Sequence, residues 1–176
     1  MRKLLLPLLL LMLVAAHVSA APADYATSRV SLFDHQIVVW GMDEDQAKLA
    51  SDPQPLLQFV RAGGVFLAMR MQQDCEWLPV PLKMDKAYML GDVLNPLHPL
   101  FKRPNLISKA SLAKVHGGSI YRAFYPVGPG WTPLISTGEE QNWDKTPALS
   151  AVPHYGLVEL PYGKGWIILC QMIPEY

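Results

Sequence analysis

Cys75 is the residue of this sequence with the most evident capacity for covalent chemistry, because it follows a predicted buried strand. Open α/β sheets place their ligands beyond the carboxyl ends of their strands. A cysteine there could act as a nucleophile, with His98 or His154 as its base. The carboxylates of Asp74 and Glu76 flank the sulfur, however, and oppose formation of the thiolate. The sequence therefore favours a buried or disulfide-bonded Cys75 over a catalytic one.

A polar segment around this cysteine is the better candidate for a ligand site. It combines hydrogen-bonding side chains with one aromatic ring, a mixture that suits a sugar or another polar ligand. Its members are Arg70, Gln72, Gln73, Asp74 and Trp77. The alternative is a loop that packs against its neighbours through Trp77.

Patterns for metals and phosphates are missing from the sequence. His35, His98, His116 and His154 lie far apart, without the i, i+4 pairing or the cysteine partners of a zinc site. The pair Gly117-Gly118 lacks the lysine and the following helix of a phosphate-binding loop. We therefore expect no metal and no cofactor.

The first twenty residues have the features of a secretory signal peptide. Arg2 and Lys3 precede an apolar run over residues 4–16, and Val18-Ser19-Ala20 supplies the small residues that a signal peptidase reads. The run is shorter than the roughly 20 residues that span a bilayer. We expect cleavage after Ala20 and export to the periplasm of a bacterium or to the medium, without stable membrane insertion. An uncleaved N-terminal anchor is the alternative.

The remaining chain has the size and composition of one globular domain. Removal of residues 1–20 takes away two basic side chains and leaves 13 basic and 15 acidic residues. This balance gives no positive surface for nucleic acid. We assign residues 21–34 to an N-terminal extension and residues 35–176 to the domain. Its two cysteines, Cys75 and Cys170, could pair in an oxidising compartment, but two buried free thiols are the preferred expectation.

A strand–helix–strand unit is the clearest structural pattern. Residues 37–40 form a short β-branched and aromatic run, and residues 65–69 form a continuous apolar one. Between them, Asp52 could cap a helix that has Pro53 in its first turn and Gly63-Gly64 at its end. The two strands should be parallel and joined by a right-handed crossover.

The rest of the chain is rich in loops until a hairpin near its end. Residues 119–125 and 131–137 have the character of strands. Residues 157–160 and 166–170 are stronger candidates, because Pro161-Tyr162-Gly163-Lys164-Gly165 between them supplies glycines for a tight turn.

Two of these segments resemble a known family. Residues 57–67, with Phe59-Val60 and Gly63-Gly64, resemble a segment of class I glutamine amidotransferase-like domains. Residues 162–169 are similar to a hairpin of sugar-associated relatives, such as the trehalose-utilisation-like domains. The resemblance implies an α/β, flavodoxin-like fold, with a mostly parallel sheet, helices on both faces and a C-terminal antiparallel hairpin.

The residues that make such domains catalytic are not matched. Active members carry a cysteine on a glycine-rich turn after a strand, where this chain has Arg70-Met71, and a histidine where it has Ile173. Isoleucine cannot accept a proton from a thiol. The resemblance therefore implies an exported, non-catalytic domain with a binding or assembly role and a carbohydrate or protein partner. The alternative is a cysteine-dependent hydrolase that uses Cys75 with His98 or His154.

Overall fold

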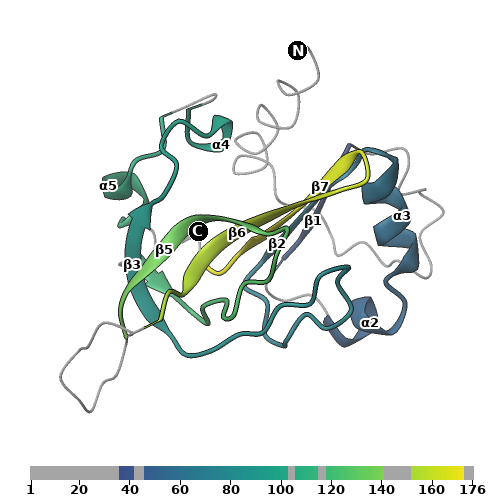
Figure 1. Ribbon diagram of the computed structural model, residues 1–176, viewed down its shortest axis with the longest axis horizontal. Coiled ribbons are helices and arrows are strands. Elements are labelled where there is room, and N and C mark those ends of the chain that lie inside the picture. The colour runs from purple at the N-terminus through teal and green to yellow at the C-terminus, as the bar shows by residue number, and fades with distance from the viewer. Residues whose placement is uncertain (1–35, 42–45, 103–105, 115–117, 141–151, 173–176) are drawn as a thin grey trace.

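The computed structural model describes residues 36–41, 46–102, 106–114, 118–140 and 152–172, which form one mixed sheet flanked by short helices (Figure 1). The strands run in the order β1-β2-β7-β6-β5-β3-β4 across the sheet. In chain order they are β1 (Ile37–Trp40), β2 (Val65–Met69), β3 (Tyr88–Val93), β4 (Ser119–Ile120), β5 (Thr132–Glu140), β6 (Tyr155–Tyr162) and β7 (Gly165–Cys170). The helices are α2 (Gln46–Ser51), α3 (Gln54–Ala62), α4 (Pro99–Lys102) and α5 (Lys109–Leu112).

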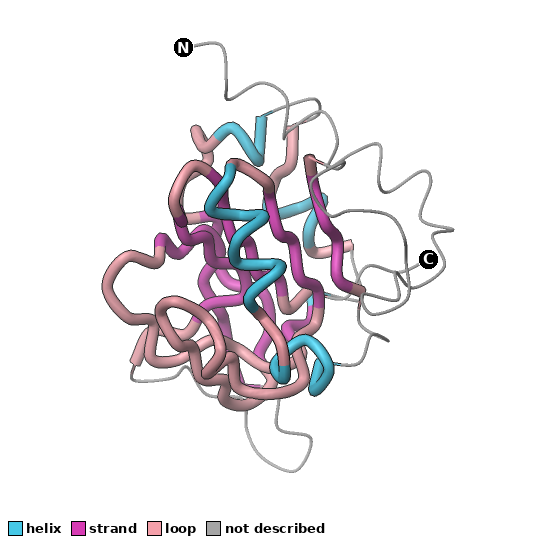
Figure 2. Tube along the Cα trace, turned by 90° about the vertical axis from the view of Figure 1, so that its right-hand side faces the viewer, coloured by secondary structure: helices cyan, strands magenta, loops and turns pink. Residues whose placement is uncertain are grey.

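The strand–helix–strand unit is confirmed. Strand β1 pairs with β2 in parallel, with Ile37 opposite Val65. Helix α3 connects them, although its N-cap position is held by Pro53, without the side-chain bond that was expected of Asp52. The helix ends at Gly63, whose φ of 126° is allowed for glycine but strained for residues with a Cβ atom. Figure 2 shows α3 in front of the strands of the sheet, and its buried residues are Leu56, Leu57, Phe59 and Val60.

The C-terminal hairpin is also confirmed. Strands β6 and β7 are antiparallel, and Tyr162 pairs with Gly165 across a turn in which Gly163 has a φ of 62°. Strand β7 then runs parallel to β2, with Cys170 opposite Met69. Because β7 lies between β2 and β6, it joins the parallel part of the sheet to the antiparallel part.

The flavodoxin-like fold class is wrong. Four of the six strand pairings in the described sheet are antiparallel, and only β1, β2 and β7 run parallel to a neighbour. A parallel pairing needs a crossover of a dozen or more residues, usually a helix. After β2 the described helices α4 and α5 have four residues each, so the chain returns through antiparallel pairings. The predicted strand over 119–125 is reduced to β4, while that over 131–137 corresponds to β5.

The sheet separates two apolar clusters. Along β7, Ile167 and Leu169 belong to the cluster formed with α3 and residues 71–84, whereas Ile168 and Cys170 belong to the cluster formed with α4. Cys75 lies in the first cluster, on the other side of the sheet from Cys170. Both cysteines are buried free thiols, as preferred from the sequence.

Candidate functional site

The segment that follows β2 is held by a buried amide. Gln46, at the start of α2, is 6% exposed, and its Oε1 accepts hydrogen bonds from the backbone nitrogens of Gln72 at 2.7 Å and Gln73 at 3.2 Å. Its Nε2 donates to the carbonyl of Arg70 at 3.3 Å. One side chain therefore fixes three backbone groups of residues 70–73.

Two further side chains complete this support. Gln171, directly after β7, is fully buried, and its Nε2 donates to the carbonyl of Met71 at 3.0 Å. Arg122 donates through Nη1 to the carbonyl of Gln72 at 2.6 Å and through Nε to that of Asp85 at 3.3 Å. This role of Gln46, Gln171 and Arg122 was not predicted from the sequence, because no local pattern marks a polar residue for contacts so far along the chain.

Arg70 has an unusual backbone conformation. Its φ of 52° is the only positive value of a non-glycine residue in the described part of the chain. Such a conformation costs roughly 1–2 kcal/mol and persists where surrounding contacts impose it. Here the Arg70 nitrogen donates to the carbonyl of Cys170 at 2.7 Å, and its guanidinium lies 4.4 Å from the centre of the Tyr121 ring.

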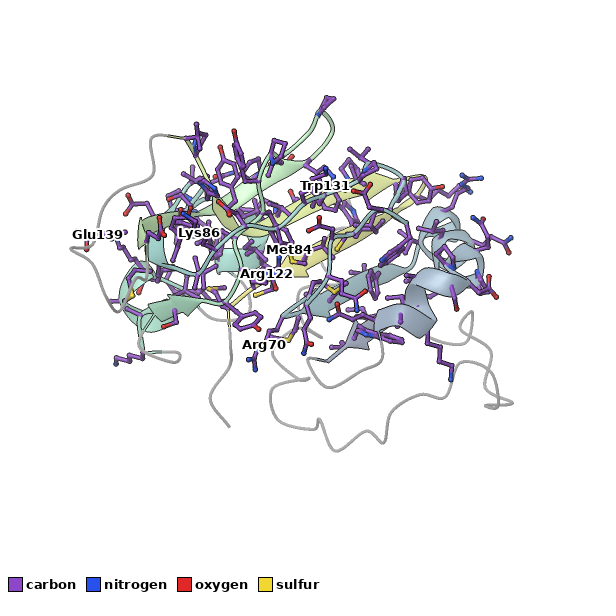
Figure 3. All side chains as sticks on the ribbon, turned by 90° about the horizontal axis from the view of Figure 1, so that it is seen from below. Arg70, Met84, Lys86, Arg122, Trp131 and Glu139 are labelled. Carbon is purple, nitrogen blue, oxygen red and sulfur yellow. The ribbon has the colours of Figure 1, made fainter. Side chains whose placement is uncertain are left out.

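These contacts create an accessible polar surface, which we call the polar edge and define as Arg70, Gln72, Gln73, Tyr121 and Arg122. Gln72, Gln73 and Tyr121 are exposed, while Arg70 and Arg122 are half-buried. Figure 3 shows Arg70 and Arg122 on the same side of the molecule, with Arg70 directed away from the ribbon. The arrangement offers amide, guanidinium and phenol groups on a fixed backbone.

No protein-family model matches the chain, and no curated protein matches it. The site must therefore be interpreted from its own geometry. No helix within the described ranges is long and apolar enough to cross a bilayer. In the same ranges, no three His, Cys, Asp or Glu side chains converge as metal ligands would.

Two of the five predicted ligand residues also take part in holding the adjacent loop. Asp74 accepts a hydrogen bond from the backbone nitrogen of Met84 at 2.9 Å through Oδ1. Trp77 is half-buried and packs edge-on against Phe66, with ring centres 6.2 Å apart. The structure thus brings Arg70, Gln72 and Gln73 together on the polar edge, and it packs Trp77 against the core as the alternative interpretation expects.

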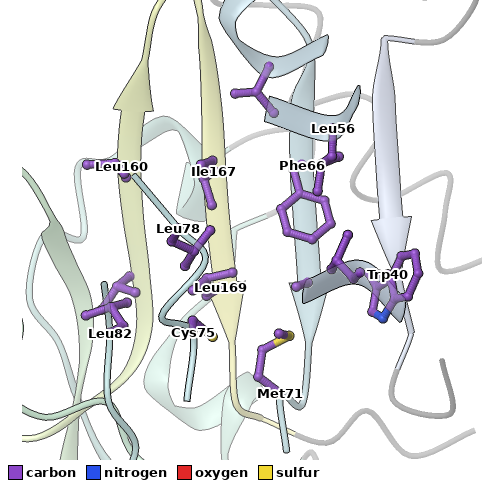
Figure 4. Packing of buried hydrophobic residues seen from close by; sticks show 14 of the residues in the cluster. Trp40, Leu56, Phe66, Met71, Cys75, Leu78, Leu82, Leu160, Ile167 and Leu169 are labelled. Carbon is purple, nitrogen blue, oxygen red and sulfur yellow. The ribbon is translucent and has the colours of Figure 1, made fainter. Parts of the chain in front are cut away.

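Cys75 is in the core beneath this loop. Its side chain has no exposure and lies among Leu78, Leu82 and Met71 (Figure 4). Burial raises the pKa of the Cys75 thiol to about 12, and the carboxylates of Asp74 and Glu76 contribute in the same direction. The thiolate needed for nucleophilic attack is therefore strongly disfavoured.

His98, the first candidate base, is used on both ring nitrogens. Its Nδ1 accepts a hydrogen bond from the backbone nitrogen of Leu100 at 3.2 Å, so Nε2 carries the proton and donates to Glu159 at 3.1 Å. His98 also packs edge-on against Phe101, on the α4 side of the sheet. Cys75 lies on the opposite side.

His154, the second candidate base, is 3% exposed and is also used on both ring nitrogens. Its Nδ1 donates to the carbonyl of Val152 at 2.9 Å, and its Nε2 lies 3.0 Å from Oδ2 of Asp85 and 3.3 Å from the hydroxyl of Tyr88. Its ring packs between those of Tyr88 and Tyr125. Neither histidine has a ring nitrogen left for a thiol.

Proposed function

We propose that this chain is an exported, non-catalytic binding domain that holds a carbohydrate, or a ligand of similar polarity, at the polar edge. The observation that carries the proposal is the support of residues 70–73. Two buried glutamines and Arg122 hold the backbone of this segment, while its polar side chains are left on the surface.

This arrangement favours binding because the segment is ordered before a ligand arrives. Burial of an amide is unfavourable unless it makes hydrogen bonds. The buried side chains of Gln46 and Gln171 make such bonds to the backbone of residues 70–73 and so hold this surface loop in one conformation. A preorganised loop lowers the entropic cost of ordering side chains on binding. Amide and guanidinium groups match sugar hydroxyls, and the exposed ring of Tyr121 offers an apolar contact with a polar rim.

The absence of catalysis is supported by the positions of the candidate groups. Cys75 is buried with a pKa near 12, and the ring nitrogens of His98 and His154 are both used. We include in this proposal a relationship to the glutamine amidotransferase-like domains that is limited to the β1–α3–β2 unit and the β6–β7 hairpin, because the rest of the sheet is antiparallel. Its support is that residues 57–67 and 162–169 fold into the helix, strands and glycine turn that their sequences predict.

The test is calorimetric titration of the chain with maltotriose, cellotriose and trigalacturonate. We expect binding of at least one of them and a loss of about two- to tenfold in affinity for Gln73→Ala, the size of one neutral hydrogen bond. Gln58→Ala, at an exposed position of α3, is the matched control and should bind as the unaltered chain does. Failure of all three saccharides to bind, or equal affinities for the two variants, would contradict the proposal.

A further inference from the structure

Resting on the proposed function, we infer that the polar edge selects saccharides that carry carboxylate groups, with Arg122 as the residue that binds the carboxylate. The inference depends on how the charges around residues 70–73 are compensated. Three observations support it: the partners of Arg122, the occupation of the nearby acidic side chains, and a second guanidinium on the same loop.

Arg122 is held by neutral groups, and no carboxylate of the described residues pairs with its charge. Its Nη1 and Nε donate to the backbone carbonyls of Gln72 and Asp85, which are neutral groups. Among the described residues no carboxylate lies within ion-pair distance of Arg122, and its Nη2 makes no hydrogen bond. Because a guanidinium stays protonated, this half-buried side chain presents a full positive charge with donors still to satisfy.

The acidic side chains near Arg122 are engaged elsewhere. The Asp85 carboxylate lies 3.0 Å from Nε2 of His154 and accepts from the hydroxyl of Tyr88 at 3.4 Å. Asp74 uses Oδ1 to accept from the nitrogen of Met84. Neither of these carboxylates is therefore paired with Arg122, and its positive charge is left available to an anionic ligand.

A second guanidinium belongs to the same loop. Arg70 belongs to the loop whose Gln72 carbonyl anchors Arg122, and its guanidinium lies over Tyr121, the chain neighbour of Arg122. Opposite charges attract, so a carboxylate that approaches Arg122 at this edge is favoured. The planar fork of a guanidinium matches a carboxylate in two parallel hydrogen bonds. The exposed Tyr121 ring adjoins both groups and can contact the sugar that bears the carboxylate.

The experiment compares trigalacturonate with maltotriose, a neutral trisaccharide, by calorimetry at low salt. We expect the unaltered chain to bind trigalacturonate at least about tenfold more tightly. Arg122→Gln should lose about ten- to hundredfold in affinity for trigalacturonate and clearly less for maltotriose, because the charged contact exists only with the acidic ligand. Arg61→Gln makes the same change of charge on α3, beside Tyr162, and should leave both affinities unchanged.

Several results would overturn the inference. If the unaltered chain binds the two trisaccharides with equal affinity, the selectivity is wrong but the proposed function stands. If the chain binds none of trigalacturonate, maltotriose and cellotriose, the proposed function itself is contradicted. An equal loss for both ligands in Arg122→Gln would show that Arg122 only supports the loop. If a sulfated trisaccharide binds more tightly than trigalacturonate, Arg122 recognises sulfate and not carboxylate, and the inference is wrong.

Arg122→Gln removes a support of residues 70–73, so folding of the variant must be checked by thermal unfolding. If that variant does not fold, Arg70→Gln takes its place, because the hydrogen bonds by which Gln46, Gln171 and Arg122 hold residues 70–73 do not involve the Arg70 side chain. It should reduce the preference for trigalacturonate about tenfold. An unchanged preference in a folded Arg70→Gln protein would overturn the inference.

Discussion

Glu159 is a buried carboxylate on β6 whose ionisation depends on His98. Burial raises the pKa of Glu159, and the interaction with His98, including its hydrogen bond, acts in the opposite direction. Because Nδ1 of His98 accepts from the nitrogen of Leu100, the imidazole is fixed in the tautomer that donates to Glu159. The pair therefore links the start of α4 to the sheet.

His98→Ala should destabilise the protein by about 1–3 kcal/mol at pH 7, because it leaves Glu159 buried without its donor. The pKa of Glu159 would then rise further above the value of about 4.3 in the unfolded chain. The native state would bind the proton more tightly, so the contribution of Glu159 to stability would be fully present below the pKa of the unfolded chain and would be lost as the pH rises through the native pKa. Urea unfolding between pH 4 and 8 measures this.

The control is the double variant His98→Ala with Glu159→Gln, which has no carboxylate to titrate at this position. It should lack the pH dependence of the single variant. The quantity to compare is the loss of unfolding free energy in His98→Ala relative to the unaltered chain. If this loss is the same at pH 7 and at pH 4.5, His98 does not control the ionisation of Glu159.

Cys75 should resist alkylation in the folded protein. Its full burial and a pKa near 12 together keep both access and thiolate fraction low. We expect iodoacetamide at pH 7.5 to leave native Cys75 unmodified over minutes and to modify it after denaturation, as measured by mass spectrometry of peptides. Rapid native labelling of Cys75 would restore the hydrolase alternative.

At the scale of elements, the close packing around α3 and the β6–β7 hairpin depends on glycines, among them Gly165 and Gly64. A Cβ on Gly165 would collide with the backbone oxygens of Val60 and Gly64, which cannot move without disturbing α3 or β2. A Cβ on Gly64 would meet the ring of Phe59. The helix therefore lies as close to the turn as backbone atoms allow.

Gly165→Ala should cost about 1–3 kcal/mol in unfolding free energy, the range for overpacking a closely fitted site. Gly128→Ala is the matched control, since its Cβ would make an ordinary contact with Val80 at 3.5 Å. Denaturant unfolding of the two variants measures the difference. Equal stabilities would mean that α3 and the hairpin can separate at little cost.

At the scale of the whole molecule, the prediction of export concerns residues 1–20, which lie outside the described residues. We expect the chain expressed with these residues in a Gram-negative host to appear in the periplasmic fraction with Ala21 as its first residue. Intact-mass measurement of that fraction determines the cleavage site. A chain that keeps residues 1–20 and stays with the membrane would support the uncleaved anchor instead.

Pairing between distant strands is the reason why the fold class was predicted incorrectly. The parallel unit of β1, α3 and β2 was extended to the whole sheet through a family resemblance, but β3, β4, β5 and β6 pair antiparallel with their neighbours. Which strands pair is decided by contacts between distant segments. Strand β7 follows β6 in the chain yet lies beside β2, about a hundred residues earlier.

Features with local causes follow from the amino-acid sequence. The α3 unit and the Gly163 turn follow from apolar periodicity, proline and glycine, and a structural Cys75 was favoured because its acidic neighbours oppose the thiolate. The support of residues 70–73 by Gln46, Gln171 and Arg122, which lie 24 to 100 residues away, arises only in the folded chain. A polar residue gives no periodic signal of its burial, because its partners are backbone groups brought close only by folding.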